Sequence, residues 1–307
     1  MILCAGEALI DMLPRKTAEG EDAFAPHAGG AVFNTAIALG RLGIDTGLFT
    51  GLSSDLFGDV LRTTLSASNV SYDLSDVTAR PTTLAFVKLT DGQASYAFYD
   101  ENTAGRMLDP GALPQLPDRV SALFFGGISL VGEPCGTAYE ALMAQNTAQR
   151  AIMIDPNIRP SFITDEVSYR ARIGRMIAMA DIVKLSDEDL HWLGGTGTIA
   201  DLAKEMLKTG PSLICITHGA EGVTGYTKQG TYFVASSPAK VADTVGAGDT
   251  FNAGLLASLF DAGALTKERL TALDESTVRD ALGLGARAAA VTVSRAGANP
   301  PWAKELT

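Results

Sequence analysis

A run of small residues in the last third of the chain combines a potential anion site with a carboxylate. Residues 243–254 read Asp-Thr-Val-Gly-Ala-Gly-Asp-Thr-Phe-Asn-Ala-Gly, and the apolar spacing that follows predicts an amphipathic helix beginning at this run. Free backbone N–H groups of Gly246, Ala247 and Gly248 at the helix N-terminus would bind an anion. Asp249, on the first turn, could take the proton of a hydroxyl that attacks a bound phosphate. The run therefore predicts phosphoryl transfer.

The composition limits the partners of the protein. The chain has 307 residues, of which 46% are hydrophobic and 19% charged, as expected for one large α/β domain with an appendage or for two small domains. A formal net charge of −11 argues against nucleic acid or an anionic membrane surface as a partner. No window reaches the ~18 unbroken apolar residues of a membrane helix. Glu7 and Asp11 interrupt the apolar N-terminus, which we expect to be a core strand and not a signal peptide.

The cysteines and histidines favour neither a disulfide nor a zinc site. Cys4, Cys135 and Cys215 lie far apart in apolar surroundings, which is typical of buried thiols in a reducing compartment. The three histidines are equally scattered. We therefore expect a cytoplasmic protein.

From about residue 121 onward, short apolar runs alternate with helical patterns. The runs 122–125, 151–154, 182–185 and 213–217 predict strands buried on both faces, and residues 134–149, 166–180 and 199–209 predict the helices between them. This rhythm indicates a Rossmann-like, mostly parallel sheet with helices on both faces. Ligands of such sheets bind beyond the carboxyl ends of the strands. The residues at these ends are therefore candidates for the ligand site: Asp155, 184–189 and 217–222.

Residues 73–101 show a different pattern. Two alternating segments flank Thr90-Asp91-Gly92-Gln93, whose Asp-Gly pair predicts a β-hairpin. We expect residues 9–28 to join this hairpin in a small antiparallel sheet that forms a lid over a cleft within a single domain of residues 1–307.

Residues 283–288 resemble a dinucleotide-binding motif, because they read Gly-Leu-Gly-Ala-Arg-Ala. No predicted strand precedes them, so we do not expect them to bind a dinucleotide.

Two segments resemble the signatures of one enzyme family. Residues 243–249 match the Asp-Thr-x-Gly-Ala-Gly-Asp signature of the ribokinase-like (PfkB) carbohydrate kinases, and residues 29–34 fit that family's Gly-Gly-x-x-x-Asn signature at the start of a helix. The resemblance extends from Gly6 to Pro301. It implies transfer of the γ-phosphoryl group of ATP to a sugar hydroxyl, with Asp249 as the base and the Gly246, Ala247 and Gly248 amides stabilising the transferred group. A catalytically inactive sugar-binding regulator with the same fold is the remote alternative.

The resemblance also assigns sugar ligands. Asp11 corresponds to an aspartate that accepts hydrogen bonds from two sugar hydroxyls, and Gly29 and Gly30 let the backbone approach the ligand closely. Asn34 offers a hydrogen-bond donor and acceptors to neighbouring sugar hydroxyls. Taken alone, this segment is equally consistent with Asn34 serving only as a residue at the start of a helix. Asp249 completes the acceptor site.

The choice of sugar depends on two further segments. Residues 98–108, which contain Phe98 and Arg106, resemble a run in bacterial fructokinases, and residues 155–159 resemble their Asp-Pro-Asn-x-Arg element, which ends at Arg159. The similar 2-keto-3-deoxygluconate kinases usually carry an arginine where this chain has Asp100. An aspartate there would repel a substrate carboxylate and favour a neutral sugar. We therefore expect D-fructose as substrate, with 2-keto-3-deoxygluconate or a nucleoside as alternatives.

The nucleotide and metal residues follow from the same resemblance. Thr217, Gly219 and Gly222 resemble the Thr-x-Gly-x-x-Gly loop that holds adenosine and phosphate, together with Gly246 and Gly248. Many relatives have Asn-x-x-Glu where this chain has Ser186 and Asp189, preceded by Lys184. Asp189, or its rival Glu188, would handle Mg²⁺ near the phosphates, although acids at a helix start often only complement the helix dipole. The resemblance also implies a site for a monovalent cation such as K⁺, formed by these residues: Asp243, Val245, Thr292 and Gly297.

The apolar alternation of the expected lid also suggests a partner. Exposed apolar sheet edges and faces tend to pair with another copy. We therefore expect a homodimer formed through the lid.

Overall fold

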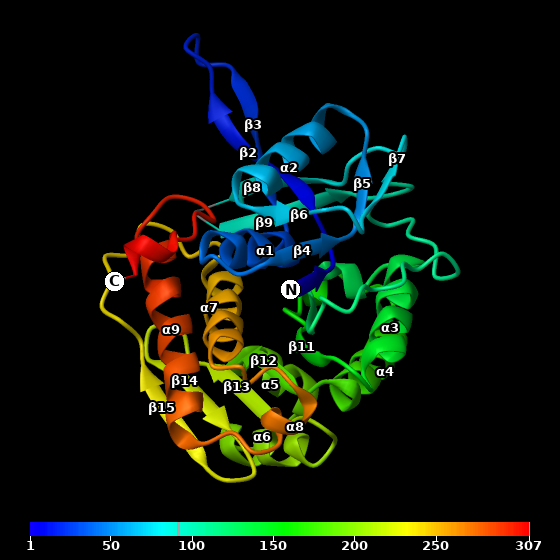
Figure 1. Ribbon diagram of the computed structural model, residues 1–307. Helices are drawn as coiled ribbons and strands as arrows, with labels where there is room; N and C mark the ends of the chain where they lie inside the picture. Colours follow the sequence, from blue (N-terminus) through cyan, green and yellow to red (C-terminus); the bar gives the residue numbers. More distant parts are fainter. Residues whose placement is uncertain (91–92, 307) are drawn as a thin grey trace.

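The computed structural model describes residues 1–90 and 93–306, and within them nine strands form a central sheet (Figure 1). Its order is β15-β14-β13-β12-β11-β10-β1-β4-β6; the seven strands from β13 to β6 are parallel, and β14 and β15 are antiparallel at one edge. The strands are β1 (Ile2–Ala5), β4 (Thr46–Phe49), β6 (Val70–Ser71), β10 (Ala122–Gly126), β11 (Ala151–Asp155), β12 (Ile182–Ser186), β13 (Leu213–Thr217), β14 (Gly222–Tyr226) and β15 (Thr231–Ala235).

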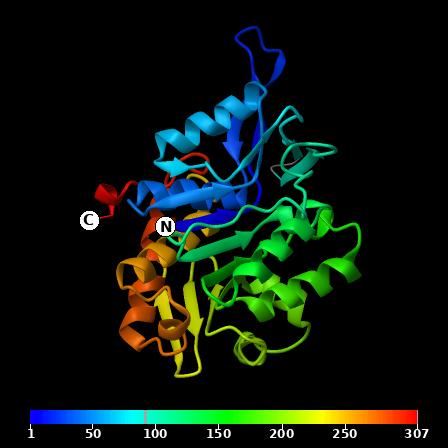
Figure 2. The ribbon, with the colours of Figure 1, turned by 45° about the vertical axis from the view of Figure 1, so that its right-hand side comes forward.

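Helices cover both faces of this sheet, as the alternating pattern predicted (Figure 2). Successive residues of a strand point to opposite faces, so Ile2 and Cys4 of β1 pack in one core cluster and Leu3 and Ala5 in the other. The first cluster takes α1 (Ala31–Arg41), α2 (Leu56–Ala67), α7 (Ala247–Asp261), α8 (Lys267–Leu270) and α9 (Glu275–Val293); the second takes α3 (Cys135–Asn146), α4 (Glu166–Met179), α5 (Asp187–Gly194) and α6 (Ile199–Leu207). Short 3-10 helices are η1 (Ile128–Leu130), η2 (Pro160–Phe162) and η3 (Ala303–Glu305).

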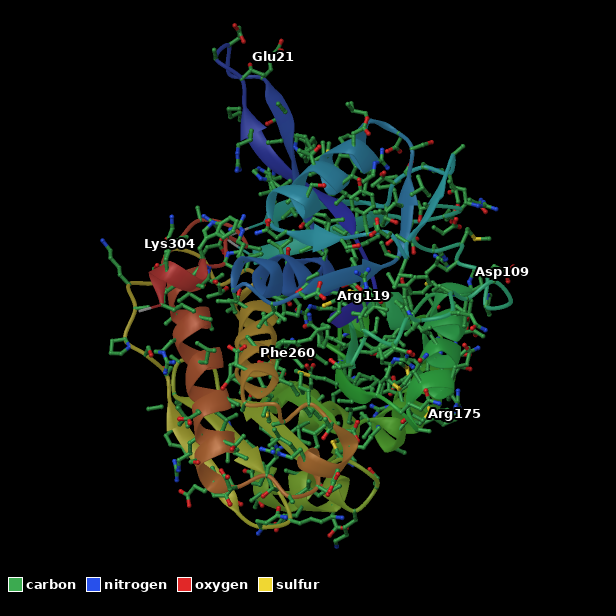
Figure 3. The ribbon with its side chains drawn as sticks, viewed as in Figure 1. Glu21, Asp109, Arg119, Arg175, Phe260 and Lys304 are labelled. Atoms are coloured by element: carbon green, nitrogen blue, oxygen red, sulfur yellow. The ribbon has the colours of Figure 1, made fainter. Side chains whose placement is uncertain are left out.

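A second sheet has four strands in the order β3-β2-β8-β9, and we call it the lid sheet. It consists of β2 (Leu9–Lys16), β3 (Asp22–Gly29), β8 (Leu84–Thr90) and β9 (Gln93–Tyr99). The β2–β3 hairpin, with Glu21 near its tip, projects from the body of the molecule (Figure 3). Two of the three strand pairs are antiparallel, as expected, but β2 and β8 pair in parallel.

The expected contribution of residues 73–101 to the lid was too wide. Residues Asp76–Thr78 (β7) pair instead with β5 (Gly51–Ser53) in a separate two-stranded sheet. Asp55 holds the intervening loop, because its carboxylate accepts hydrogen bonds from the Thr82 amide (2.8 Å) and hydroxyl (2.6 Å). The lid strand therefore begins only at Leu84. The Asp91-Gly92 pair lies outside the described residues, and the strands on either side of it pair antiparallel.

Two glycines let α7 and α9 approach closely, which anchors the helix that begins at the phosphate-site signature. A Cβ atom at Gly254 of α7 would lie 2.7 Å from the Cα atom of Gly285, and one at Gly285 would lie 2.7 Å from the ring of Phe251. The Gly-Leu-Gly-Ala-Arg-Ala segment thus lies inside α9, where Gly285 serves helix packing.

The three thiols are buried and free, as expected, and burial raises the pKa values of Cys135 and Cys215 to about 12.

Within residues 1–90 and 93–306, no helix has both the length and the apolar character needed to cross a membrane.

Candidate active site

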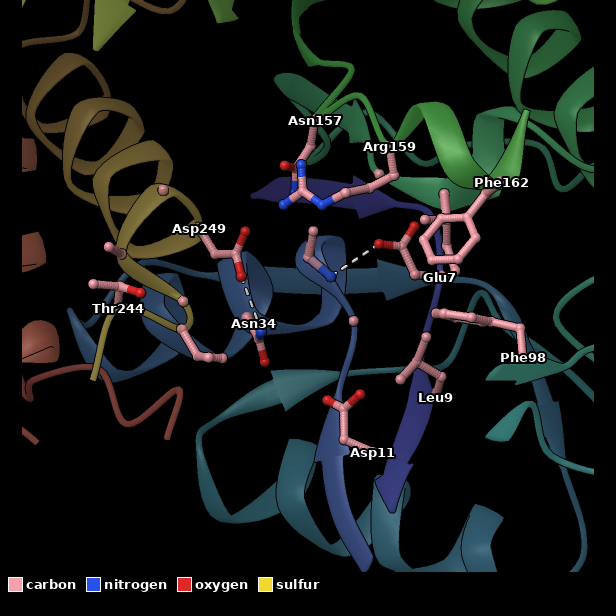
Figure 4. A pocket seen from close by; sticks show the side chains of 18 of the residues that line it. Glu7, Leu9, Asp11, Asn34, Phe98, Asn157, Arg159, Phe162, Thr244 and Asp249 are labelled. Atoms are coloured by element: carbon pink, nitrogen blue, oxygen red, sulfur yellow. Dashed lines mark hydrogen bonds between the residues drawn. The ribbon is translucent and has the colours of Figure 1, made fainter. Parts of the chain in front are cut away.

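A cavity of about 520 Å³ lies between the lid sheet and the carboxyl ends of the central strands (Figure 4). This volume is typical of small-molecule sites. The lid sheet, the strand ends, the start of α1 and the start of α7 all contribute to its wall. The lining includes Glu7, Leu9, Asp11, Gly30, Ala31, Asn34, Phe98, Gly127, Asn157, Arg159, Phe162, Lys184 and residues 244–249.

Asp249 lies buried on the first turn of α7 and lines the cavity. The residue before the helix, Gly246, has φ 77°, a left-handed conformation that favours glycine, and a Cβ atom there would also lie 2.7 Å from the Cβ atom of Ala298. Burial raises the pKa of the Asp249 carboxyl to about 7, and the hydrogen bond from Asn34 opposes this rise. A carboxylate with a pKa near neutrality is well matched to general-base catalysis.

Helix α1 holds Asp249 from the opposite end of the sequence. The side-chain amide of Asn34 donates a hydrogen bond to Asp249 Oδ2 (2.9 Å), and the Thr35 hydroxyl donates to the Asp249 carbonyl oxygen (3.2 Å). Asn34 is therefore not a helix-start residue, because α1 begins at Ala31 and the amide of Ala31 donates to Glu7. The two signature segments meet directly in the folded chain.

A buried cation lies against the glycine turn. The ammonium group of Lys184 donates to Asp155 Oδ2 (3.0 Å), and a Cβ atom at Gly248 would lie only 3.2 Å from Lys184 Nζ. The side-chain amide of Asn252 also donates to Asp155 Oδ2 (2.7 Å). Because Lys184 and Asp155 are both buried and paired, the ammonium is fixed beside the free N–H groups of the α7 N-terminus, where an anion would benefit from both.

Asp11 lies on β2, on the lid side of the cavity. Its carboxylate lies so close to the backbone of Gly29 that a Cβ atom at Gly29 would be 2.1 Å from Asp11 Oδ2. Gly30 has φ 106°, and a Cβ atom there would lie 3.0 Å from the carbonyl oxygen of Glu7. The two glycines of the second signature therefore make room for Asp11 and Glu7. Burial raises the pKa of Asp11 to about 6.

Sequence reasoning missed the role of Glu7. This buried carboxylate lines the cavity and accepts hydrogen bonds from the backbone amides of Ala31 (2.9 Å) and Ser129 (3.2 Å). A Cβ atom at Gly127 would lie 2.0 Å from Glu7 Oε1. Glu7 thus joins β1, the start of α1 and the loop after β10. The sequence signal for this role is an acidic residue directly after the apolar run at the N-terminus.

Two other lining residues, Asn157 and Phe162, were also absent from the predicted site. Asn157 has φ 46° and follows the carboxyl end of β11, within the Asp-Pro-Asn-x-Arg element. Phe162 belongs to η2, and its ring contacts the ring of Phe98 with centroids 4.5 Å apart. Only the three-dimensional arrangement shows that these residues line the same cavity as Arg159.

Arg106 and Asp100 do not line this cavity. They form an ion pair (2.8 Å) at a neighbouring cavity of about 420 Å³, which shares Phe98, Ile128 and Phe162 with the first. Asp100 therefore does not present a free negative charge to a substrate carboxylate, as the sequence had predicted, because its charge is balanced by Arg106. Arg159, by contrast, lines the main cavity.

Of the expected nucleotide residues, Lys184, Gly246 and Gly248 line the cavity, whereas the loop with Thr217, Gly219 and Gly222 lies outside its lining. Thr217 ends β13, the neighbour of β12, and its hydroxyl donates to the carbonyl of Leu185 (3.3 Å). Gly219 and Gly222 have φ values of 54° and 138°, and a Cβ atom at Gly222 would lie 2.3 Å from the carbonyl oxygen of Val234. The backbone conformation and packing of this turn therefore require glycine whether or not a ligand binds. Its contact with a nucleotide stays a prediction.

The acidic residues after β12 differ in burial. Ser186 is the N-cap of α5 and accepts a hydrogen bond from the Asp189 amide (3.0 Å), which gives it a structural role. Asp189 is buried, and its pKa is raised by burial and by the nearby charge of Asp155. Glu188 is exposed.

The four residues expected at a monovalent-cation site lie near one another. Asp243 accepts hydrogen bonds from the backbone amides of Val245 (3.0 Å) and Gly297 (2.9 Å). The carbonyl of Thr292 accepts from the Arg295 amide (3.0 Å) at the end of α9. Among the described residues, no group of three or more His, Cys, Asp or Glu side chains is arranged to hold a metal ion.

Comparisons with known proteins agree with this geometry. A family model described as pfkB family carbohydrate kinase matches residues 1–305. A fructokinase of Rhizobium leguminosarum bv. trifolii is 58% identical over 280 residues, which cover 91% of this chain and 86% of that protein. The probable fructokinase-4 of Arabidopsis thaliana is 32% identical over 308 residues, covering 98% and 93%.

A solved structure shows the same fold. The fructokinase of Xylella fastidiosa with bound ATP is 29% identical, has a TM-score of 0.89, and is matched over 99% of this chain and 97% of its own. The expected α/β fold, with its large mostly parallel sheet and small second sheet, is confirmed. The chain therefore belongs to the pfkB family of carbohydrate kinases, and it is a sugar kinase with the ribokinase-like fold.

Proposed function

We propose that the protein is a fructokinase that transfers the γ-phosphoryl group of ATP to a hydroxyl of D-fructose. The observation that carries this proposal is the hydrogen bond between Asn34 and Asp249, which joins the sugar-side signature to the phosphate-side signature in one cavity. The 58% identity to the Rhizobium fructokinase supports the sugar, and the ATP-bound Xylella structure supports the donor.

Asp249 acts as the general base in the proposed mechanism. In its ionised form it accepts the proton of the sugar hydroxyl as that oxygen attacks the γ-phosphorus and the bond to the leaving oxygen of ADP breaks. Asn34 orients the carboxylate through Oδ2, which leaves Oδ1 for the proton. Asp11 accepts hydrogen bonds from sugar hydroxyls across the cavity, and Arg159 and Phe98 complete the acceptor side.

The start of α7 stabilises the charge of the transferred group. The amide of Ala247 already donates to the Thr244 carbonyl (3.3 Å), so the amides of Gly246, Gly248 and Asp249 are the donors that we assign to the phosphoryl oxygens. The Lys184 ammonium, fixed by Asp155, adds a positive charge beside them. We assign Thr217, Gly219 and Gly222 to the adenosine side, because their loop follows the strand next to β12.

Magnesium would neutralise the β- and γ-phosphates of the donor. The buried Asp189 fits a carboxylate ligand of this ion or of its water shell, because it lies near the Lys184–Asp155 pair, whereas Glu188 is exposed.

We further propose that backbone oxygens near Asp243, Val245, Thr292 and Gly297 hold a monovalent cation. The two oxygens of Asp243 serve this loop by fixing its backbone amides.

Arg159 favours a second candidate substrate. A guanidinium group in the acceptor cavity could pair with a carboxylate, as a 2-keto-3-deoxygluconate kinase would require. A coupled ADP-release assay with D-fructose, 2-keto-3-deoxygluconate, ribose and nucleosides separates these functions. We expect the highest kcat/KM for fructose. Turnover of the acid without turnover of fructose would show that Arg159 binds a substrate carboxylate, and turnover of none of these compounds would favour a binding protein.

The activity should depend on pH through Asp249. Because burial raises the pKa of this base to about 7, its ionised fraction falls as the pH falls through that value. We expect log kcat/KM to drop with a slope approaching one per pH unit below about 7 and to level off above it. A profile measured in buffers of constant ionic strength tests this, and a flat profile between pH 5 and 7 would contradict it.

Gly29→Ala should weaken sugar binding. The new Cβ atom would lie 2.1 Å from Asp11 Oδ2, so the carboxylate must move away from its present position. Loss of charge-assisted hydrogen bonds costs about 1.5–3 kcal/mol, and we expect the sugar KM to rise about 10- to 100-fold. Gly174→Ala is the matched control, since a Cβ atom there meets no atom within 4 Å. An unchanged sugar KM in Gly29→Ala would remove Asp11 from the acceptor site.

We propose a homodimer through the outer face of the lid sheet. Strand alternation points Asp11 and Phe98 toward the cavity and places Phe24, Phe86 and Tyr99 on the other face, where their rings meet edge to face at 5.0 and 5.4 Å. Phe24 is 47% exposed and Tyr99 62%. Exposed clustered aromatic rings favour a protein interface.

The dimer can be tested with a charge on this face. We expect Phe24→Asp to convert a dimer into a monomer in sedimentation velocity, because a carboxylate would be desolvated between the two lids. Val167→Asp, at a position that is 81% exposed on α4, is the matched control and should leave the sedimentation coefficient unchanged. A wild-type protein that sediments as a monomer at all concentrations would contradict the proposal.

A further inference from the structure

Glu7 has no role in the mechanism above, although its side chain is buried and lines the acceptor cavity (Figure 4). It comes two residues after the end of β1. Each of its two carboxylate oxygens accepts a backbone N–H: Oε1 from Ala31 (2.9 Å) and Oε2 from Ser129 (3.2 Å). Because the protein already holds both oxygens, the carboxylate is better placed to order the backbone around it than to bind a sugar hydroxyl.

Helix α1 obtains from Glu7 the acceptors that its own N-terminus lacks. Its N-cap residue is Gly30, which has no side chain to cap the helix, and its first turn contains no acidic residue. The carboxylate of Glu7 accepts from the Ala31 amide, and the carbonyl oxygen of Glu7 accepts from the Phe33 amide (3.2 Å). Free N–H groups at a helix start need acceptors, and a negative charge there is favourable. Glu7 therefore fixes the first turn of α1 to the end of β1.

The space that Glu7 occupies is left open by two glycines. A Cβ atom at Gly127 would lie 2.0 Å from Glu7 Oε1, and one at Gly30 would lie 3.1 Å from Glu7 Cγ. Burial raises the pKa of Glu7, and the hydrogen bonds from Ser129 and Ala31 oppose this rise. Burying a carboxylate is costly, so a packing role alone does not account for an acid at this position.

The start of α1 also holds the base of the proposed mechanism. Asn34 and Thr35 follow Ala31 by three and four residues, and they donate to the carboxylate (2.9 Å) and the carbonyl oxygen (3.2 Å) of Asp249. Hydrogen bonds thus connect Glu7 to Asp249 through little more than one turn of helix. A shift of this turn would move the carboxylate that takes the proton, and misplacing a reacting group by about 1 Å can lower a rate ~10²-fold.

We propose that Glu7 is a positioning residue for phosphoryl transfer, which fixes the first turn of α1 and, through that turn, the place of Asp249. This inference rests on the proposed role of Asp249 as the base. It gives Glu7 no direct contact with the sugar. Loss of its hydrogen bonds should therefore lower kcat and leave the sugar KM close to the wild-type value.

Glu7→Gln tests this proposal, because it keeps the length of the side chain but has one oxygen in place of two. One backbone amide then loses its acceptor, and we expect kcat to fall about tenfold while the sugar KM changes less than about threefold. Asp274→Ala is the matched control. It removes the carboxylate that caps α9 by accepting from the Thr277 amide (2.7 Å), and it should lower the Tm and leave kcat unchanged.

A double-mutant cycle with Asn34→Ala locates the effect. If Glu7 acts through α1, Glu7→Gln should lower the kcat of Asn34→Ala by less than about threefold, because the hydrogen bond that it positions is already absent. Losses that multiply in full would overturn the proposal. A raised sugar KM with wild-type kcat would also overturn it and make Glu7 a sugar ligand. A lower Tm with both constants unchanged would leave Glu7 with a structural role only.

Two further measurements separate this proposal from the proposed function. The cycle is run with the sugar of highest turnover, so a result against fructose does not affect it. Asp249→Asn is assayed beside it, and full turnover by that variant would contradict the assigned base. Slow turnover by Asp249→Asn together with wild-type kcat in Glu7→Gln would contradict only the positioning role. If Glu7→Gln does not fold, Glu7→Asp replaces it with the same expected results, because its shorter carboxylate cannot reach both amides.

Discussion

Replacing Asp249 by asparagine is expected to lower kcat by ~10²- to 10⁴-fold and to change the sugar KM by no more than a few-fold. The amide keeps the shape of the side chain and can still accept the hydrogen bond from Asn34, but it cannot take a proton. Substrate positioning by Asp11 and the α7 amides therefore remains, while the proton transfer is lost. Steady-state kinetics with fructose as the varied substrate measure both constants.

The same variant should be more stable than the wild type above neutral pH. The pKa of Asp249 is raised to about 7 in the folded state and is near 3.9 in an unfolded chain, so the folded state holds the proton more tightly. The resulting stabilisation is present below about pH 4 and is lost as the pH rises to about 7, where a buried carboxylate must ionise. We expect the Tm of Asp249→Asn to exceed that of the wild type at pH 8.

Together, the kinetic constants and the Tm of Asp249→Asn distinguish a lost base from a folding defect. Asp181→Asn replaces a carboxylate that pairs with Lys267 away from the cavity, and it should leave kcat unchanged. Full turnover by Asp249→Asn would remove Asp249 as the base. Slow turnover together with a lower Tm at pH 8 would indicate a folding defect instead.

Replacing Lys184 by methionine is expected to destabilise the protein by about 3–5 kcal/mol and to lower kcat by ~10²-fold or more. The substitution leaves the buried carboxylate of Asp155 with hydrogen bonds from Asn252 and the Asn157 amide but without its cation, and breaking a buried ion pair from one side has a cost of this size. It also removes the cation beside Gly248, where the transferred phosphoryl group is assigned. Urea unfolding and ADP-release kinetics measure the two effects.

A double variant separates stability from chemistry. Lys184→Met with Asp155→Asn removes both charges, so most of the lost unfolding free energy should return, because a neutral amide has a smaller desolvation cost. Activity should stay low, because the cation is still absent. Recovery of activity along with stability would show that Lys184 serves only the fold.

Much of the site could be predicted from short motifs. The glycine turn before Asp249 and the Gly29-Gly30 pair require glycine for reasons that show in the structure as a positive φ and as Cβ positions that other atoms occupy. The parallel sheet followed from alternating apolar runs and helical patterns. The lid boundary was misplaced, since Asp55 holds Thr82 in a loop through contacts across 27 residues that no local pattern reveals.

The sequence by itself determined the family, the reaction and the residues of the phosphate turn, because these depend on backbone conformations and spacings that are local in the chain. Tertiary structure decided which distant residues meet: Asn34 and Thr35 at Asp249, Lys184 at Gly248, and Glu7 between α1 and the loop after β10. It also paired Asp100 with Arg106 outside the main cavity. Charge balance, burial and pKa depend on neighbours in space, so the fold had to bring those neighbours together before the electrostatics of the site could be known.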